Sequence, residues 1–274
     1  MLFRSTDQAG LTNLAREIRQ QGVSVSSIGV GTDFNEDLMQ AIAELGSGAY
    51  GYLADASQLA SIFQKDLQQA GTTIARDVRL SFELPEGVEL GDVLGYRSSQ
   101  VGRTVSVPMT DFSAGQVERL VARLTVNAPQ AGRSFDVTRL QLQYSDLLKN
   151  APVETSLNLS AMTTDDRSEV LARRDKDATV YAARAQSAWN MNQAAESVKQ
   201  GDRQKANEYM QKNMALFGEA AQVAGPAAVA SDLKAQEAIN DDFQNARGAE
   251  AVQNAAKGAK RKARQDFGLM GSTY

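Results

Sequence analysis

Two of the side chains most used in protein chemistry are missing from this 274-residue sequence, which has no cysteine and no histidine. Metal sites built from thiolate or imidazole, Ser-His-Asp and Cys-His catalysis, and histidine acid–base steps are therefore excluded. The lack of cysteine also means that disulfides cannot indicate the redox compartment.

The sequence also lacks a basic excess and long apolar runs. Its formal net charge is −4, whereas a surface that binds nucleic acid normally needs a marked excess of Lys and Arg. We therefore expect no nucleic-acid partner. No run approaches the roughly 18 to 20 apolar residues of a membrane span, and residues 1–10 do not form a signal peptide. The length predicts two or three domains, and 42% hydrophobic residues suffice for a core.

The first region, residues 1–72, alternates between helical and strand patterns. The segment "LTNLAREIRQQG" predicts a helix that ends at Gly22, with an apolar face of Leu11, Leu14, Ala15 and Ile18. The segments "VSVSSIGVG" and "AYGYLAD" predict strands. The helix between them is expected to begin near Asp33 to Asn35, and a further helix is expected at Ser57. Strands joined by helices lie parallel in one sheet, so the pattern indicates an α/β architecture.

The second region, residues 73–164, changes to a period of two. In "ARDVRLSFEL" the apolar residues alternate, and four more short segments repeat this pattern between Gly, Pro, Asn and Asp signals. Short alternating strands with regular turns are typical of an antiparallel β-sandwich. No helix of any length is predicted in this region.

The third region, residues 165–274, is rich in Ala, Gln, Lys and Glu. One long helix is predicted from "EVLARRDKDATV" to Gly201, and a second carries Ala206, Met210, Met214 and Phe217 in register. The short "GD" link between them predicts an antiparallel hairpin. A weaker third helix has Pro226 in its first turn, and the tail is expected to be helical at first and frayed afterwards.

The segment "SVSSIGVGTDFNEDLMQAIAELGSGAYGYLADASQLASIF" resembles the C-terminal half of a von Willebrand factor type A (VWA) domain. The resemblance is strongest to the bacterial branch labelled calcium-activated chloride channel-like, in which "IGVG" is followed by an acidic "DFNEDLM" helix start. That branch commonly carries a β-sandwich and a helical hairpin after the VWA domain. The resemblance therefore implies a partial Rossmann-like α/β unit, a β-sandwich and a helical C-terminal region.

Members of this family hold a divalent cation such as Mg²⁺ at the carboxyl ends of the strands. Their D-x-S-x-S motif has no counterpart here: the nearest strings are "DASQL" at Asp55 and "DFSAG" at Asp111. We therefore expect no metal or other cofactor in this chain, and expect Mg²⁺ only in an intact family member. The rim of the family's ligand face would consist of Gly31, Thr32, Asp33 and Asn35. Ordinary helix capping is the preferred role for Thr32, Asp33 and Asn35, and the two roles can coexist.

The resemblance implies a non-enzymatic, adhesion-type protein that binds a protein partner, in a parent protein that is extracytoplasmic or attached to the cell envelope. The alternative is a structural or assembly subunit that acts independently of metal. The first strands of the family sheet would precede Leu11, so the chain is expected to be the C-terminal part of a longer protein. Its strand at residues 23–30 would then have an unpaired edge, which predicts a weak first region.

Other motifs have ordinary structural explanations. Gly29 and Gly31 could open a dinucleotide-binding loop, but the third glycine of that fingerprint is replaced by Phe34, and a tight strand exit is preferred. The pairs Glu36-Asp37 and Asp165-Asp166 are interpreted as solvated helix starts, because adjacent helical residues point about 100° apart.

Two sets in the third region are interpreted in the same way. The helical-spaced residues Trp189, Met191, Met210, Met214 and Phe217 are expected to be hairpin core rather than a binding groove. The basic run "KGAKRKAR" at residues 257–264 is interpreted as a solvated helix end, with nucleic acid or an anionic membrane as the alternative.

Overall fold

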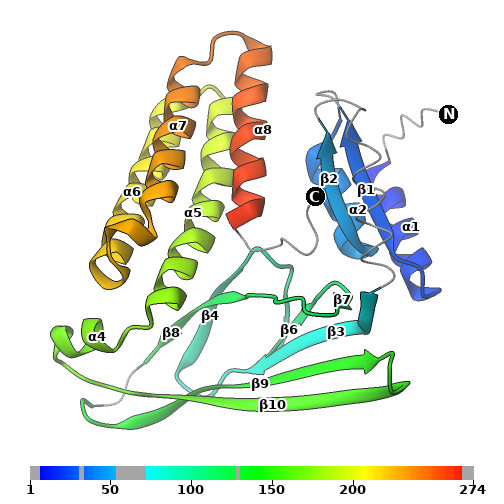
Figure 1. Ribbon diagram of the computed structural model, residues 1–274, viewed down its shortest axis with the longest axis vertical. Helices are drawn as coiled ribbons and strands as arrows, with labels where there is room; N and C mark the ends of the chain where they lie inside the picture. Colours follow the sequence, from blue (N-terminus) through cyan, green and yellow to red (C-terminus); the bar gives the residue numbers. More distant parts are fainter. Residues whose placement is uncertain (1–6, 31–33, 54–71, 128–129, 267–274) are drawn as a thin grey trace.

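The computed structural model describes residues 7–30, 34–53, 72–127 and 130–266. Antiparallel strands form a base, and both an N-terminal α/β part and a C-terminal bundle of helices stand on it (Figure 1). The observed fold is thus an α/β unit, a β-sandwich and a helical region in chain order, as the sequence predicts. No helix within these ranges is both long and apolar enough to cross a bilayer.

The α/β part contains α1 (Gln8–Gln20), β1 (Val25–Val30), α2 (Glu36–Leu45) and β2 (Ser47–Leu53). The two strands pair in parallel, and both helices pack against each other and against β1. Within the described ranges β1 has only this one neighbour. The helix expected at Ser57, together with the Asp55 string, lies outside the described residues.

Two details of this part differ from the sequence prediction. Helix α1 starts before Leu11, because the carboxylate of Asp7 accepts the N–H of Gly10 at 2.8 Å and caps the first turn. Leu14, predicted on the buried face, is 51% exposed, and Ala15 is the buried residue of α1. A side chain at Gly48 would place its Cβ 2.3 Å from the carbonyl oxygen of Val25, so only glycine allows β2 to enter the sheet here.

The base is an antiparallel sandwich. One sheet has the order β10-β9-β3-β6-β5, with β7 paired to the end of β3, and β4 and β8 form a second pair. The strands are β3 (Thr73–Glu83), β4 (Val88–Leu94), β5 (Ser99–Val101), β6 (Thr104–Pro108), β7 (Phe112–Ser113), β8 (Val121–Val126), β9 (Ser134–Asp146) and β10 (Ala151–Met162). Their core is Phe82, Leu84, Val88, Val105 and Val107.

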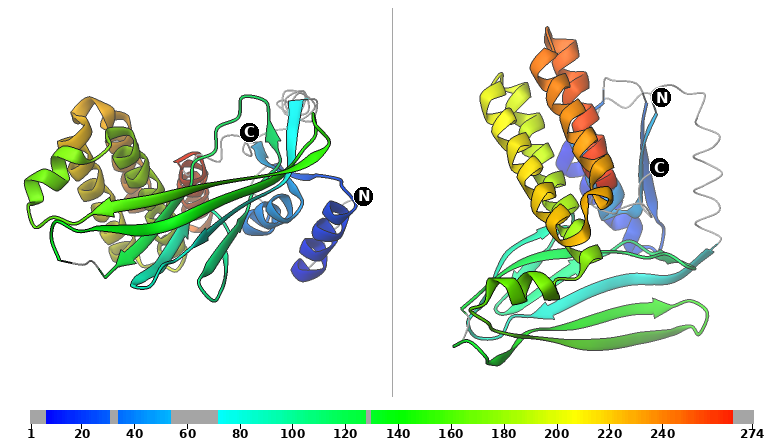
Figure 2. Two further views of the ribbon diagram at one scale, coloured as in Figure 1. Left: turned by 90° about the horizontal axis from the view of Figure 1, so that it is seen from below. Right: turned by 60° about the vertical axis from the view of Figure 1, so that its left-hand side comes forward.

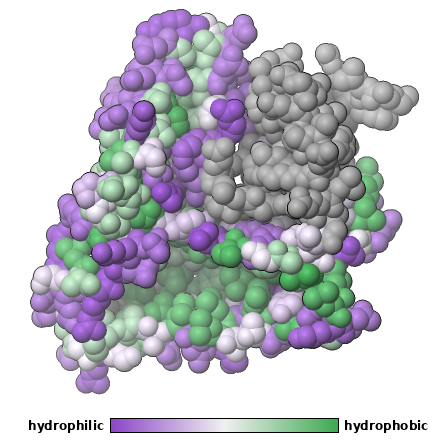
Figure 3. Space-filling view, viewed as in Figure 1, coloured by the Kyte–Doolittle hydropathy of each residue, from purple (hydrophilic) through white to green (hydrophobic). Residues whose placement is uncertain are grey.

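The sandwich is open on one side. Apolar side chains of β3, β8 and β9 line a groove of about 560 Å³ between the two sheets, and apolar residues gather over the strands of the base in Figure 3. Strands β9 and β10 run side by side along the base (Figure 2). Strand β10 is the outer strand of the larger sheet, and its residues Leu157 and Met162 are more than half exposed.

The helical region consists of α4 (Arg167–Arg173), α5 (Lys176–Lys199), α6 (Arg203–Ala224), a 3₁₀ turn (Pro226–Ala228), α7 (Ala230–Asn245) and α8 (Ala249–Asp266). The prediction of one continuous helix up to Gly201 is wrong at its start. Arg174 is extended, and the carboxylate of Asp175 caps a new helix by accepting the N–H of Ala178 at 2.7 Å. The hairpin of α5 and α6 is as predicted, and Gly201 has the positive φ of +83° that its turn requires.

The core of the bundle contains three of the five residues predicted for it: Met191, Met210 and Phe217 are at most 1% exposed. Trp189 is instead 38% exposed, with its ring and that of Tyr209 in a T-shaped contact, and Met214 is only partly buried. Helix α8 packs along α5 through Ala256, Ala259 and Ala263, all buried. The tail is helical at first, as expected, over Ala249–Asp266. Its last residues, 267–274, lie outside the described residues.

A polar network also lies in this core. The amide of Asn213 is fully buried: it accepts from Asn190 Nδ2 at 2.7 Å and donates to Gln236 Oε1 at 2.8 Å and to the Ser187 carbonyl at 3.2 Å. Each member satisfies groups that would otherwise be buried without a partner. The network therefore ties α5, α6 and α7 together in one register.

Candidate functional site

The face predicted from the sequence lies where β1 ends and α2 begins. Of its four residues, Gly31, Thr32 and Asp33 lie outside the described residues, and Asn35 is described. Asn35 is the N-cap of α2, and its Oδ1 accepts the N–H of Leu38 at 3.1 Å. The capping role weighed for Asn35 is therefore confirmed.

Gly29, considered as part of a nucleotide-binding loop, has a local reason to be glycine. A Cβ at this position would lie 2.3 Å from the ring of Phe34, so the ring packs directly on the strand backbone. The Phe34 ring thus covers the end of β1.

The acidic pair that opens α2 diverges, as adjacent helical positions must. Glu36 is only 8% exposed, so its interpretation as a solvated cap is wrong. The side chain of Asp37 is 69% exposed. Asp166, of the second acidic pair, is the N-cap of α4, and its Oδ1 accepts the N–H of Ser168 at 2.8 Å.

Helix α8 meets this face through the basic run. Lys260 Nζ donates to both carboxylate oxygens of Asp37, at 2.9 and 3.1 Å, and lies 2.8 Å from Glu196 Oε1 on α5. One turn earlier, Lys257 Nζ lies 4.7 Å from the centre of the Phe34 ring, within the range of a cation–π contact. The interpretation of this run as a solvated helix end is therefore wrong for its central residue, Lys260, which is 8% exposed.

The charges at this junction stabilise one another. Burial lowers the pKa of the Lys260 ammonium, but its hydrogen bonds to Glu196 and Asp37 outweigh that effect and leave the pKa above its ordinary value. Burial likewise raises the pKa of Glu196, while Lys260 and Lys199 lower it further than burial raises it. Lys260 and Glu196 are therefore both charged at neutral pH.

A second junction joins α1 to the base. Arg19 donates to both oxygens of Asp111, at 2.6 and 3.0 Å, and to Asp77 at 2.9 Å. Asp111 is 9% exposed; its burial raises the pKa of its carboxyl more than the nearby Arg19 lowers it. Asp111, which begins one of the two strings nearest to the metal motif, therefore binds a guanidinium group.

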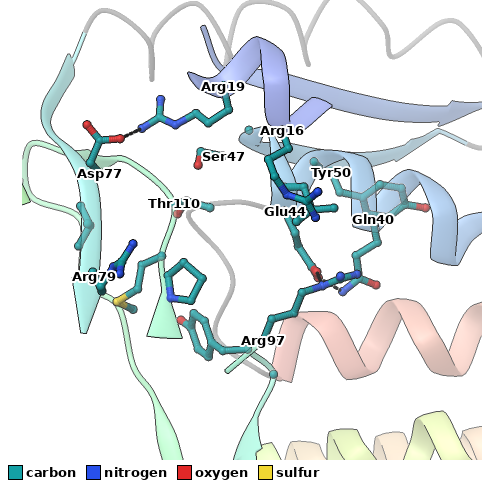
Figure 4. A pocket seen from close by; sticks show the side chains of 18 residues that line it. Arg16, Arg19, Gln40, Glu44, Ser47, Tyr50, Asp77, Arg79, Arg97 and Thr110 are labelled. Atoms are coloured by element: carbon teal, nitrogen blue, oxygen red, sulfur yellow. Dashed lines mark hydrogen bonds and ion pairs between the residues drawn. The ribbon is translucent and has the colours of Figure 1, made fainter. Parts of the chain in front are cut away.

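A third ion pair also joins the α/β part to the base: Arg97, after β4, donates to Glu44 of α2 at 2.6 Å. The α/β part is thus held at the base by the arginine junctions and beside the bundle by Lys260. Between α1, α2 and the base lies a cavity of about 450 Å³, with Arg16, Arg19, Arg79 and Arg97 on its walls (Figure 4).

The described residues do not fit a metal site of the family's kind. Asn35 is engaged as a helix cap and Asp111 by Arg19. Across the described part of the chain, no three His, Cys, Asp or Glu side chains are grouped in a way that could hold an ion. The charged groups of this arrangement instead form ion pairs that join the α/β part to the base and to the bundle.

Local sequence patterns missed the residues that build these junctions. Arg19, Arg97 and Lys260 bind carboxylates 92, 53 and 223 residues away along the chain. One available signal was the spacing of Ala256, Ala259 and Ala263, which marks a small-residue face suited to close helix packing. That spacing places Lys260 next to the packed face.

Comparison with known proteins is consistent with this architecture. No protein-family model matches the chain. It is 29% identical over 131 residues to YfbK of Escherichia coli K12, described as an uncharacterized protein; the match covers 46% of this chain and 23% of YfbK. A solved structure described as a von Willebrand factor type A protein from Catenulispora acidiphila is similar with a TM-score of 0.61 and 17% identity, over 90% of this chain and 60% of that one.

The human COPII-coat protein Sec24c is also similar, with a TM-score of 0.51 and 12% identity over 96% of this chain and 37% of that one. At these identities the comparison concerns the fold, and the fold of this chain is VWA-like. The chain spans about a quarter of the length of YfbK and less than two thirds of either structure.

Proposed function

We propose that this chain is a non-enzymatic protein-binding module of an adhesion-type VWA protein, and that it holds no divalent cation itself. The parent protein is assigned to the bacterial cell envelope or its exterior, on the resemblance of "IGVGTDFNEDLM" to the chloride channel-like branch. The proposal applies to the chain a property of the fold family, because the VWA-like fold is common among proteins that bind other proteins.

The observation that carries the proposal is the contact between α8 and the start of α2. Here the carboxylate of Asp37 accepts an ammonium group, and the ring of Phe34 accepts a second one. The face of the α/β part thus already recognises a basic helix within its own chain. An exposed carboxylate beside an aromatic ring is a general means of recognising a protein surface that carries lysine or arginine.

The test of binding is affinity capture by the immobilised chain from an extract of the source cells, with Asp37→Lys as the variant and Asp177→Lys as the control. Asp177 lies in the first turn of α5, an exposed acidic position on another helix. We expect a protein that is retained by the wild type and the control and lost with Asp37→Lys. Equal retention by all three chains, or no specific retention, would contradict the proposal.

The test of the metal assignment is calorimetric titration of Mg²⁺ into the chain. We expect no saturable heat in the micromolar range, since Mg²⁺ needs several oxygen ligands in octahedral arrangement. Micromolar binding to one site would overturn the assignment.

The second candidate is a structural or assembly subunit that acts independently of metal. The observation that favours it is the set of three junctions, Lys260–Asp37, Arg19–Asp111 and Arg97–Glu44, which join the regions to one another. The reading frame upstream of Met1 separates the two candidates. An intact D-x-S-x-S motif there favours metal-dependent adhesion, and a degenerate motif favours the scaffold.

A further inference from the structure

The cavity between the α/β part and the base is distinct from the face discussed above. It lies at the opposite end of the strands, where α2 ends and β2 begins, and residues Leu45, Ser47 and Gly48 line it there. Strands β3 and β6 supply the other wall, which includes Val78 and Met109. Its volume of about 450 Å³ is within the usual range of small-molecule sites, and such sites favour boundaries between domains.

The walls of this cavity carry more positive than negative charge. Four guanidinium groups, from Arg16, Arg19, Arg79 and Arg97, face two carboxylates, from Glu44 and Asp77. Arg97 is paired with Glu44, and Arg19 with Asp77 and with Asp111 behind the wall. The lining therefore has an excess of two positive charges.

The excess resides in two arginines. The guanidinium of Arg16 donates to the amide oxygen of Asn13 at 2.7 Å, and neither Arg16 nor Arg79 has a carboxylate partner among the described residues. Figure 4 shows Arg79 on the β3 wall and Arg16 on the facing wall formed by α1 and α2. A molecule between these walls would meet a cation on either side.

The rest of the lining suits an organic body rather than a bare ion. Pro108, Met109 and Val78 supply apolar surface on one wall. Tyr50 and Tyr96 contribute aromatic rings, and the hydroxyl of Tyr96 is held by Glu118 at 2.8 Å. Apolar surface with a few charged groups is the usual composition of a site that binds a small organic molecule.

We propose that this cavity binds a small organic dianion, whose two negative charges are taken up by Arg79 and Arg16 while its apolar body lies between the walls. Arginine is suited to this role because its planar guanidinium binds carboxylate or phosphate oxygens in pairs. A dianion at this position would bridge the α/β part and the base, so its binding would stabilise both together.

The experiment measures binding by calorimetry and thermal shift on the full chain, with two classes of probe. Phenyl phosphate carries both charges on one group, whereas a C6 dicarboxylate, adipate, carries them at its two ends. Inorganic sulfate is the probe without an organic body. We expect saturable binding and a raised melting temperature with one organic probe, at least about tenfold tighter than sulfate, as charged hydrogen bonds and apolar contact predict. The preferred probe identifies which acidic group the site takes.

The variants are Arg79→Ala and Arg16→Ala, with Arg174→Ala as the control. All three arginines are exposed, and the control lies between α4 and α5, away from the cavity. We expect each cavity variant to weaken binding about tenfold or more and the control to leave it unchanged. Circular dichroism spectra of the variants serve as the control for folding.

The proposal is overturned if no organic dianion binds, or if both cavity variants bind as the wild type does. It is also overturned if Arg174→Ala weakens binding equally, because the effect is then one of overall charge. The capture experiment varies Asp37 and contains no added anion, whereas the anion titrations vary Arg16 and Arg79 and contain no protein partner. Each experiment can therefore fail without affecting the other.

Discussion

The α/β part and the helical bundle bury their residues in different ways. In the bundle, the large side chains of Phe217, Phe243, Met191 and Met210 are at most 1% exposed. In the α/β part, the buried apolar residues among those that the structure describes are Ala15, Ala41, Ala43 and Tyr50, over a sheet of two described strands. A two-stranded sheet is marginal by itself. The bundle is therefore stabilised by its own core, whereas the α/β part depends on the junctions with its neighbours.

The largest effect is expected from Phe217→Ala in the bundle. Removing this fully buried ring deletes its packing and leaves a cavity, which costs about 3–5 kcal/mol of the free energy of unfolding. Chemical denaturation followed by circular dichroism at 222 nm measures the loss. The control is Trp189→Ala, an aromatic truncation at a 38% exposed position of the same bundle, for which we expect about 1 kcal/mol. Equal losses would contradict the description of Phe217 as the core residue.

Native-state hydrogen exchange compares the two regions directly. We expect the amides of Val25–Val30 to exchange at least about 100-fold faster than those in the middle of α6, because the small sheet can open while the bundle stays folded. The measurement is made on the monomer with mass spectrometric readout. Equal protection of β1 and α6 would show that both regions unfold as one unit.

A smaller loss is expected from Asn213→Ala. This change leaves the amides of Asn190 and Gln236 buried without one partner each, which costs about 2 kcal/mol. Gln211→Ala is the matched control, an exposed amide on the same helix, and should change the free energy of unfolding by less than about 0.5 kcal/mol. Both values are measured from urea unfolding curves. If Asn213→Ala leaves the free energy of unfolding unchanged, the network does not contribute to stability.

The smallest effect is expected at the Lys260 junction, and it depends on pH. The pKa of Glu196 is lower in the folded chain than its ordinary value of 4.5, so its contribution is present above pH 4.5 and is lost as the pH falls through the folded-state pKa. The pKa of Lys260 is raised above 10.5, so its contribution is present below that value and is lost at higher pH. The junction is therefore fully formed between about pH 5 and 10.

The variant Lys260→Met keeps the packed stem and removes the charge. It should cost about 1 kcal/mol at pH 7, because Asp37 is 69% exposed and its attraction is screened by solvent. The difference from the wild type should shrink when unfolding is measured at pH 3.5. Lys234→Met on α7 is the control. A pH-independent difference would mean that Lys260 acts only through packing.

Local pattern was sufficient for most elements and insufficient for the links between them. The period of two in β3 and the spacing of Met210 and Phe217 each follow from burial of one face, so both could be read from the sequence. The break at Asp175 was missed because Ala- and Lys-rich neighbours favour a helix on either side, although Asp is a preferred N-cap residue and its carboxylate caps α5 here. Glu36 was misjudged because a helix start is usually solvated.

In the candidate sites, too, local roles could be predicted from the sequence and long-range contacts could not. Asn35 was expected either at the rim or as a cap, since an Asn before an apolar helix has a strong local preference. Arg19, Arg97 and Lys260 could not be assigned, because a charged residue on a helix or in a loop gives no indication of a partner more than 50 residues away. Lys260 in particular sits in a run whose charge suggested solvent, while the alanines around it determine its burial.

The bond between Lys260 and Asp37 spans 223 residues, and this separation sets an order of events during synthesis. Long-range contacts form late, because the chain between them must first be arranged. A ribosome that adds about 10 residues per second needs about 20 seconds to reach Lys260 after Asp37 has emerged. During that interval β1 and α2 lack the contact with Lys260. The edge of β1 that has no neighbouring strand within the described ranges can then pair with a strand of another nascent chain.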